Sequence, residues 1–285
     1  MIQQTIFEAY NTCKKKLRSA GIEDYGFEAR QIIRYITGYD NNKILSCYNQ
    51  RLTQYQQRRL NEIIAQRIGR FPLQYILGEW DFYGRTFCVG TGVLIPRADT
   101  ETLVETVLQI LKEKPDAQVL DLCSGSGCIG ISIALENETS KVTLVEKYDL
   151  AIGYIEKNIE RNGAQNVRVI QGDIFENAGA DREYDIIVSN PPYVTEQEME
   201  NLQPEVKFEP DSALYGGKDG LMFYRYIALN YKDSLKNGGV LAFEVGYNQA
   251  SAVKEIMAEC GYSNIRFAED AAGINRVVFG TLNKV

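Results

Sequence analysis

Apolar residues recur every three or four positions through the first eighty residues, which is the period of a helix with one buried face. One such run predicts a helix that stops at Gly21. Its apolar positions are Ile2, Ile6, Tyr10, Cys13 and Leu17. Residues 27–36, which end before Gly38, and a run from Thr53 to Gly69 predict two more helices. The pattern therefore predicts an all-α domain over residues 1–78.

The pattern changes at Trp80. Residues 81–89 are aromatic and β-branched around Gly84, which predicts a β-hairpin. We therefore interpret residues 79–96 as a hairpin linker between two bodies. Beyond it, Asp99 or Thr100 is expected to cap a helix. The apolar face of that helix would comprise Leu103, Val104, Val107, Leu108 and Leu111.

From residue 118 onward, short apolar runs alternate with helical patterns. This rhythm predicts an α/β domain over residues 97–285, with a mostly parallel sheet covered by helices on both faces. The predicted strands are 118–122, 142–146, 167–170, 184–189 and 240–245, with two closing runs near Ile265 and Val277. The predicted helices are 128–135, 150–162, 221–235 and 249–260.

Composition adds a charge asymmetry to this picture. The chain has 285 residues, and its 31 Lys or Arg and 38 Asp or Glu give a net charge of −7. Residues 1–80 hold 12 of the basic and 7 of the acidic residues, a net of +5, which leaves 19 and 31, a net of −12, in the rest. Two interpretations stay open: solvated surfaces of unequal composition, or a helical domain that meets an anionic partner.

The chain contains no histidine, which excludes Ser-His-Asp and Cys-His catalysis and any histidine-ligated metal. Its six cysteines form no CxxC pair, so we expect no zinc cluster and instead small buried thiols in a reducing compartment. No apolar run approaches the ~18 residues of a membrane span, and the start does not resemble a signal peptide. We therefore expect a cytoplasmic protein with no membrane partner.

A glycine-rich segment follows the first predicted strand of the α/β part. Gly125, Gly127 and Gly130 fit G-x-G-x-x-G, in which glycines allow a tight turn, close approach to a ligand and packing of the helix on the sheet. Glu146 ends the next strand, 19 residues after Gly127, where a carboxylate can accept both hydroxyls of a ribose. This order of strand, glycine-rich turn, helix, strand and acidic residue indicates an adenosine-containing cofactor. A purely structural turn is the alternative.

The residue before this loop separates two classes of cofactor. Nicotinamide dehydrogenases usually have the first glycine directly after the strand, whereas here Asp121 precedes the loop. The segment resembles the first motif of S-adenosylmethionine-dependent methyltransferases, and a carboxylate suits the cationic amino group of that ligand. The resemblance also implies that Asp173 and Ile174 flank the adenine ring, with Ile174 as an apolar wall. For Asp173, an ordinary turn carboxylate is the alternative.

A second motif, Asn190-Pro191-Pro192-Tyr193, ends an apolar strand. Two prolines fix the backbone and remove two N–H donors, so the loop presents acceptors: the Asn190 side-chain oxygen and a backbone carbonyl. Two acceptors match the two N–H groups of a planar –NH2, and Tyr193 supplies a flat face. The motif resembles that of methyltransferases acting on planar nitrogens, either exocyclic amines of bases or the side-chain amide of glutamine. The alternative is a structural Pro-Pro turn.

Further segments favour the side-chain amide of glutamine over the exocyclic amines of bases. They are residues 72–78, 82–84, 94–101, 209–221 and 244–249. Together they resemble the family of peptide chain release factor glutamine methyltransferases over about residues 70–280, while residues 1–70 fit its N-terminal domain in length and position. The resemblance implies a helical substrate-docking domain (1–78), a hairpin linker (79–96) and a Rossmann-like S-adenosylmethionine methyltransferase domain (97–285).

The resemblance also implies the reaction and its residues. The substrate would be the side-chain amide nitrogen of the glutamine in the Gly-Gly-Gln motif of release factors, and the product of the cofactor would be S-adenosylhomocysteine. No metal is implied. The expected substrate and catalytic residues are Asn190, Pro191, Pro192 and Tyr193. The expected cofactor residues are Asp121, Cys123, Ser124, Gly125, Ser126, Gly127, Glu146, Asp173, Ile174 and Asn190.

Two features have open roles. Cys123 stands where relatives often have glycine, so we expect a backbone conformation there that is open to a residue with a Cβ. Contact with the cofactor and plain packing are both possible for its side chain. Arg97, Thr100 and Glu101 could position the linker, position the cofactor or cap a helix.

No general base is assigned, because an oriented amide can attack a charged sulfonium before it loses its proton. Three alternatives to the release factor reaction stay open. A ribosomal-protein glutamine methyltransferase shares the chemistry. A nucleic-acid amine methyltransferase is disfavoured by the net −12 of the catalytic part, so no direct nucleic-acid substrate is expected. A non-catalytic binder is disfavoured by the intact motifs.

Overall fold

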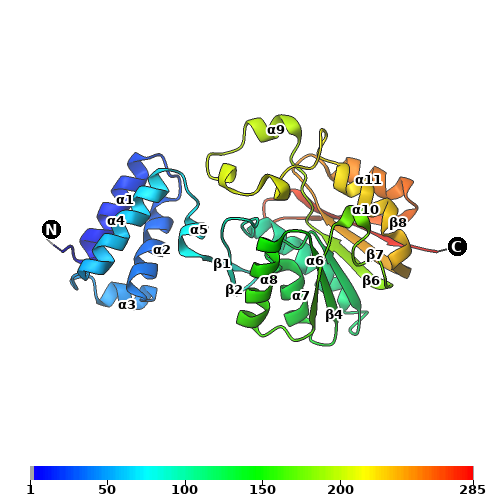
Figure 1. Ribbon diagram of the computed structural model, residues 1–285, viewed down its shortest axis with the longest axis horizontal. Coiled ribbons are helices and arrows are strands. Elements are labelled where there is room, and N and C mark those ends of the chain that lie inside the picture. The colour runs from blue at the N-terminus through cyan, green and yellow to red at the C-terminus, as the bar shows by residue number, and fades with distance from the viewer. Residues whose placement is uncertain (1–2, 285) are drawn as a thin grey trace. The chain divides into compact units, whose positions relative to one another are not determined.

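The computed structural model describes residues 3–284, and the chain divides into two compact units (Figure 1). The first contains the chain up to Gly78 together with Pro204–Phe208. The second contains Glu79–Gln203 and the chain from Glu209 onward. Residues 204–208 lie within the range that the sequence assigns to the catalytic domain.

The first unit is all-α. The three predicted helices are confirmed as α1 (Ile6–Ser19), α2 (Tyr25–Thr37) and α4 (Gln54–Ile68), although Ile2 lies outside the described residues. Two short helices were not predicted, α3 (Asn41–Ser46) and α5 (Leu73–Leu77). Thr5 and Thr53 each form a capping box, and the helices share one core whose fully buried side chains include Leu17, Ile32, Ile33, Leu60 and Ile63.

The predicted hairpin is confirmed as β1 (Glu79–Phe82) and β2 (Arg85–Cys88), which pair antiparallel. Tyr83 and Gly84 both have positive φ, which suits a two-residue hairpin turn. The Glu101 carboxylate accepts a hydrogen bond of 2.8 Å from the Tyr83 amide. Phe82 and Phe87 are fully buried in the core of the second unit, so the hairpin is packed as part of that unit.

A seven-stranded sheet forms the centre of the second unit, in the order β5-β4-β3-β6-β7-β9-β8. The first five strands of this order are parallel, and β9 is antiparallel to both of its neighbours, β7 and β8, which confirms the mostly parallel sheet. The strands are β3 (Gln118–Leu122), β4 (Lys141–Glu146), β5 (Val167–Gln171), β6 (Tyr184–Ser189), β7 (Leu235–Glu244), β8 (Tyr262–Glu269) and β9 (Asn275–Leu282).

Helices cover both faces of this sheet (Figure 1). One core lies beneath α6 (Glu101–Leu111), α7 (Cys128–Glu136) and α8 (Asp149–Asn162). The other lies beneath α10 (Met222–Asn230) and α11 (Ala250–Glu259). A further short helix, α9 (Glu196–Glu200), lies between β6 and α10. The helices among residues 3–284 include none long and apolar enough to cross a membrane.

Two boundary predictions were wrong. The helix predicted over 221–235 ends at Asn230, because Leu235 already pairs with Tyr184 as the first residue of β7. The predicted cap of α6 is also absent. A 3-10 turn, η1 (Ala98–Thr100), leads directly into the helix, and Thr100 has a helical backbone with no capping hydrogen bond from its side chain. Its hydroxyl instead accepts from the side chain of Asn190.

Candidate active site

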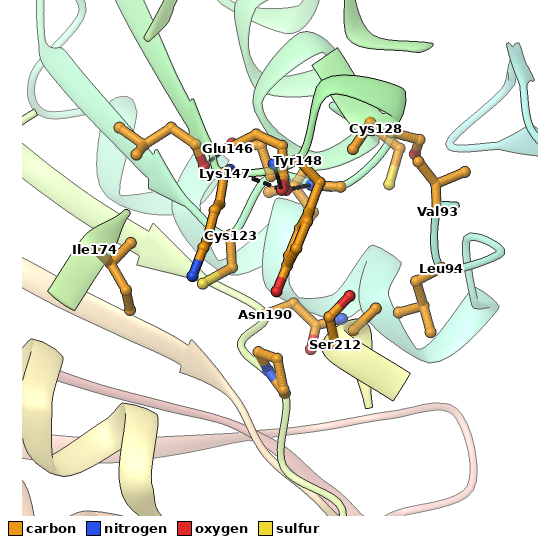
Figure 2. A pocket seen from close by; sticks show the side chains of 18 of the residues that line it. Val93, Leu94, Cys123, Cys128, Glu146, Lys147, Tyr148, Ile174, Asn190 and Ser212 are labelled. Atoms are coloured by element: carbon orange, nitrogen blue, oxygen red, sulfur yellow. Dashed lines mark hydrogen bonds between the residues drawn. The ribbon is translucent and has the colours of Figure 1, made fainter. Parts of the chain in front are cut away.

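A cavity lies where the parallel strands of the second unit end, the edge at which α/β sheets bind ligands. It encloses about 990 Å³ of space, counting the open solvent at its mouth. Its walls come from the loops that follow β3, β4, β5 and β6, and from residues 92–97 and 212–213. Figure 2 shows the side chains of these segments arranged around one hollow.

The glycine loop turns the chain from β3 into α7. Gly125 and Gly127 have positive φ of 56° and 79°, which favours glycine. A Cβ at Gly125 would meet no protein atom within 4 Å, so space beside this cavity-lining backbone is left open. A Cβ at Gly130 would lie 2.1 Å from Leu144 Cδ2, so only glycine lets α7 pack this closely on β4.

Asp121 is fully buried beneath this loop and does not line the cavity. Its Oδ2 accepts a 3.0 Å hydrogen bond from the Gly130 amide, and its Oδ1 has no partner among the described residues. Burial raises the pKa of Asp121 to about 8. We therefore expect Asp121 to act by holding the loop against α7.

The expectation for the backbone of Cys123 was wrong, because its φ is +60°, in the left-handed region. The chain leaves β3 here and turns so that the Ser124 amide donates to Val145 O of β4, at 3.1 Å. The Cys123 side chain lines the cavity (Figure 2). Burial raises the pKa of its thiol, so the group stays protonated and is a weak nucleophile.

Glu146 lines the cavity at the end of β4. Its Oε2 accepts from the Gly125 amide at 2.8 Å, and its Oε1 accepts from the amides of Lys147 at 2.8 Å and Tyr148 at 3.0 Å (Figure 2). Burial raises the pKa of Glu146, and these three amides oppose that rise. The carboxylate therefore joins the glycine loop to the loop after β4.

Another part of the cavity wall is apolar. Ile174 is 4% exposed and lies in η2 (Ile174–Glu176), and the rings of Phe175 and Phe223 lie 5.1 Å apart beside it on the same wall. Asp173 accepts from the Phe175 amide at 2.9 Å and from Lys147 Nζ at 2.7 Å. Partial burial tends to raise the pKa of Asp173, but these two donors outweigh it and lower the pKa.

Asn190 lines the cavity at the end of β6. Its Nδ2 donates to Thr100 Oγ1 at 3.4 Å. Pro192 also lines the cavity, whereas Pro191 and Tyr193 do not. Tyr193 packs against the core beneath α10 and α11, where burial raises the pKa of its phenol, and its carbonyl accepts from Gln249 Nε2 at 2.9 Å. The loop after it is held by the Val194 amide, which donates to Leu214 O at 2.7 Å.

Several lining residues were missed by the sequence analysis. Lys147 and Tyr148 directly follow Glu146, and this adjacency was the available signal. Phe223 gave no signal, because nothing in the sequence shows that α10 begins beside the loop after β5. Ser212 and Ala213 lie inside a segment quoted above only for its resemblance.

Glu209 and Arg97 hold the loop before α6, and Glu101 holds the hairpin turn. The buried Glu209 carboxylate accepts from the Ile95 amide at 3.0 Å and pairs with Arg97. Arg97 thus fixes a cavity wall, and Glu101 fixes the hairpin turn through Tyr83. Residues 3–284 contain no group of three or more Cys, Asp and Glu side chains arranged to hold a metal ion.

Comparison with known proteins assigns both parts of the chain. Residues 97–208 match the family model described as the methyltransferase small domain, and residues 8–78 match the PrmC N-terminal domain. The release factor glutamine methyltransferase of Fusobacterium nucleatum is 37% identical, over 95% of this chain and 77% of its own length. That of Clostridium botulinum is 36% identical, over 98% of each.

A solved structure shows the same fold. The T. thermophilus 16S rRNA N2 G1207 methyltransferase, in complex with AdoMet and guanosine, is 19% identical with a TM-score of 0.51, over 72% of this chain and 50% of its own. At that identity only the fold is shared. The full-length relatives carry the assignment, and they bear out the resemblance that the motifs gave: the chain belongs to the family of release factor glutamine methyltransferases.

Proposed function

We propose that this protein transfers the methyl group of S-adenosylmethionine to the side-chain amide nitrogen of the glutamine in the Gly-Gly-Gln motif of peptide chain release factors. One observation carries the proposal. Glu146 with the glycine loop, and Asn190 with Pro192, line a single cavity in a chain of this family. A cofactor site and an amide site are therefore within reach of each other. The reaction would occur in the cytoplasm, where release factors act.

The residues that line the cavity support S-adenosylmethionine as the cofactor. Glu146 is a carboxylate at the end of β4, where ribose hydroxyls are commonly bound. Ile174 and Phe223 form an apolar wall suited to an adenine ring, and open space lies beside Gly125. We expect the cofactor to contact these residues together with Cys123, Ser124 and Ser126. When bound, it supplies a methyl group on a positively charged sulfur.

Because that methyl group is already activated, the protein's task is to orient a poor nucleophile. The lone pair of an amide nitrogen is delocalised into its carbonyl group. We expect Oδ1 of Asn190, which lines the cavity, to accept one N–H group and so aim the lone pair at the methyl. The resemblance implies the carbonyl of Pro191, a residue that does not line the cavity in this structure, as the second acceptor. Orientation of this kind can lower a barrier by several kcal/mol, and by about 7–11 kcal/mol where the geometry is optimal. A chain without histidine is adequate for this chemistry.

A second hollow supports a protein substrate. It contains about 830 Å³ of space, including open solvent, and shares Tyr148, Ser212 and Phe223 with the cavity. Met199, Tyr215 and Met222 also line it. An open, largely apolar approach to a buried amide site suits an extended loop that carries a glutamine at its tip. We propose that residues 1–78 dock the rest of the release factor, with 79–96 as linker and 97–285 as catalytic domain.

The test is methyl transfer from radiolabelled S-adenosylmethionine to purified release factors. We expect incorporation into the wild-type factor and none into a factor whose Gly-Gly-Gln glutamine is changed to alanine. Incorporation into both factors would contradict the proposed position. Labelling of bare RNA or DNA, without labelling of protein, would replace the proposal with a nucleic-acid amine methyltransferase.

A further inference from the structure

A buried carboxyl group lies next to Asn190 and has no role in the mechanism above. Glu244 is the last residue of β7, and the pairing of Ser189 with Phe243 makes Asn190 and Glu244 neighbours where β6 and β7 end. Glu244 is 3% exposed and is not among the residues that line the cavity. Thr100, 2% exposed, lines the cavity on the same side. Glu244 can therefore act on Asn190 only from outside the cavity, whereas Thr100 is part of the cavity wall.

The hydrogen bonds of these groups fix the direction of the Asn190 amide. Asn190 Nδ2 donates to Thr100 Oγ1 at 3.4 Å. The buried Glu244 carboxyl neighbours Asn190 at the paired ends of β6 and β7, and the side chains of Thr100 and Asn190 both favour its ionised form. An ionised carboxylate can only accept, so the Thr100 hydroxyl and the Asn190 –NH2 must be the donors. Both contacts therefore hold Nδ2 and leave Oδ1 as the free end of the amide.

We propose that Glu244, together with Thr100, is a positioning residue that holds the Asn190 amide with Nδ2 turned away from the reacting nitrogen, so that Oδ1 faces the –NH2 of the substrate. An asparagine amide can rotate by 180° with almost no change in shape, and the rotated form would present a donor to a donor. The inference rests on the proposed function, since it assigns a direction to an amide that binds an –NH2 group.

The charge on Glu244 is sensitive to pH near neutrality. Burial raises the pKa of Glu244 to about 7, with Thr100, Arg276 and Asn190 lowering it and Asp99 raising it. The other titratable groups that face this carboxyl are Tyr193, Tyr224 and Cys128, all neutral at this pH because burial raises the pKa of each. Its Oε2 has no hydrogen-bond partner among the described residues.

The direction of the pH effect follows from this charge. Above pH about 7 the carboxylate is an acceptor only, and the Asn190 amide has one favoured direction. Below it the protonated carboxyl can itself donate, to Thr100 or to Asn190 Oδ1, and the preference is lost. We expect kcat to fall as pH decreases from 8 to 6, while cofactor affinity stays nearly constant.

The test compares Glu244→Gln with the wild-type enzyme on a release factor. Glutamine keeps the shape and removes the charge, so kcat should fall by about 10- to 100-fold, as for a misplaced reacting group. The dissociation constant of S-adenosylmethionine, measured by calorimetry, should change less than about twofold. The variant's kcat should also be flat between pH 6 and 8, a change that a merely structural role would not produce.

Thr100 provides a second, matched pair. Thr100→Val keeps the shape and removes the hydroxyl, so it should lower kcat, whereas Thr100→Ser should recover most of that rate. If Glu244→Gln fails to fold, as judged by circular dichroism, this pair decides the question. Equal rates in the valine and serine variants would overturn the inference, as would a wild-type rate and pH profile in a folded Glu244→Gln. A wild-type enzyme that labels no release factor would instead contradict the proposed function.

Discussion

On the cofactor side of the cavity, the Glu146 carboxylate accepts from the backbone amides of Gly125, Lys147 and Tyr148. On the acceptor side, the Asn190 amide donates to the Thr100 hydroxyl and lies beside the buried Glu244 carboxyl at the ends of β6 and β7. Backbone donors of a packed loop cannot rotate away or change protonation, whereas a side-chain network can do both. Near neutral pH, turnover should therefore respond to the titration of Glu244 more than cofactor binding does, because three backbone amides oppose the rise in the pKa of Glu146.

Removal of the Asn190 side chain should give the largest effect and separate the two sides most clearly. Asn190→Ala deletes an acceptor for the substrate –NH2 and should lower kcat by about 100- to 1,000-fold, the range for loss of one preorganised polar contact at a reacting group. The cofactor's dissociation constant should change little. Kinetics on a release factor and calorimetry with S-adenosylmethionine measure the two quantities.

Asn230→Ala is the matched control for this variant. Asn230 is exposed at the end of α10, is not among the residues that line the cavity, and its side chain donates to the carbonyl of Tyr226 one turn earlier. We expect both quantities to stay at the wild-type level. If Asn190→Ala lowered the affinity for S-adenosylmethionine by as large a factor as it lowered kcat, Asn190 would belong to the cofactor side. The division of the cavity into a cofactor side and an acceptor side would then be wrong.

Glu146→Ala tests the cofactor side by the same two measurements. It leaves three backbone amides without their acceptor and removes the proposed ribose partner. A hydrogen bond to a charged group contributes about 1.5–3 kcal/mol, so loss of the ribose contact should lower S-adenosylmethionine affinity by about 10- to 100-fold. With saturating cofactor, kcat should fall less than in Asn190→Ala. An unchanged dissociation constant would remove Glu146 from the cofactor site.

The same difference explains what the sequence could predict. The glycine loop and Glu146 are separated by one helix and one strand, and Asn190-Pro191 directly follows an apolar strand, so local pattern was sufficient to find them. The contact of Thr100 with Asn190 joins residues 90 positions apart, and sequence analysis assigned Thr100 a possible capping role. Glu244 fell within a predicted strand and a segment quoted for its resemblance, but it received no role, because that role depends on β7 lying beside β6.

Long-range ion pairs escaped prediction for the same reason. In the first unit, the nearly buried Arg67 pairs with Glu28 at 2.7 Å and with Glu205 at 3.0 Å, and Arg70 pairs with Glu205 at 3.1 Å. Phe208 packs edge-on against Phe71. These contacts attach residues 204–208 to the helical unit, although the sequence pattern had assigned them to the other domain by position alone.

Gly130→Ala tests how strictly the backbone determines the cofactor side. Its Cβ would overlap Leu144 Cδ2 at 2.1 Å and lie 2.9 Å from Asp121 Oδ2, so β4 and α7 would have to separate. Overpacking of a dense core costs about 1–3 kcal/mol in the free energy of unfolding. Denaturant unfolding measures the loss, and cofactor affinity should fall with it.

Gly153→Ala is the control for the substitution itself. Gly153 lies within α8, and a Cβ there meets no atom within 4 Å. Because alanine favours helix more than glycine does, this variant should be more stable by about 0.5–1 kcal/mol. Equal stability of the two variants would show that the loop can relax, and that the cofactor side is less rigid than the acceptor side.

Substitution of Cys123 should give the smallest effect on the free energy of unfolding. Glycine should here be at least as stable as alanine, which is the reverse of the usual order. The left-handed backbone at Cys123 costs a residue with a Cβ about 1–2 kcal/mol, a cost that glycine avoids. Glycine loses more entropy on folding, by about 0.5–1 kcal/mol. Cys123→Gly should therefore be as stable as Cys123→Ala or more stable by up to about 1.5 kcal/mol, whereas glycine is ordinarily the less stable of the two. A Cys123→Ala variant that was clearly the more stable in denaturant unfolding would show that the turn at β3 carries no strain, and that the cofactor loop does not require a glycine-like conformation at this position.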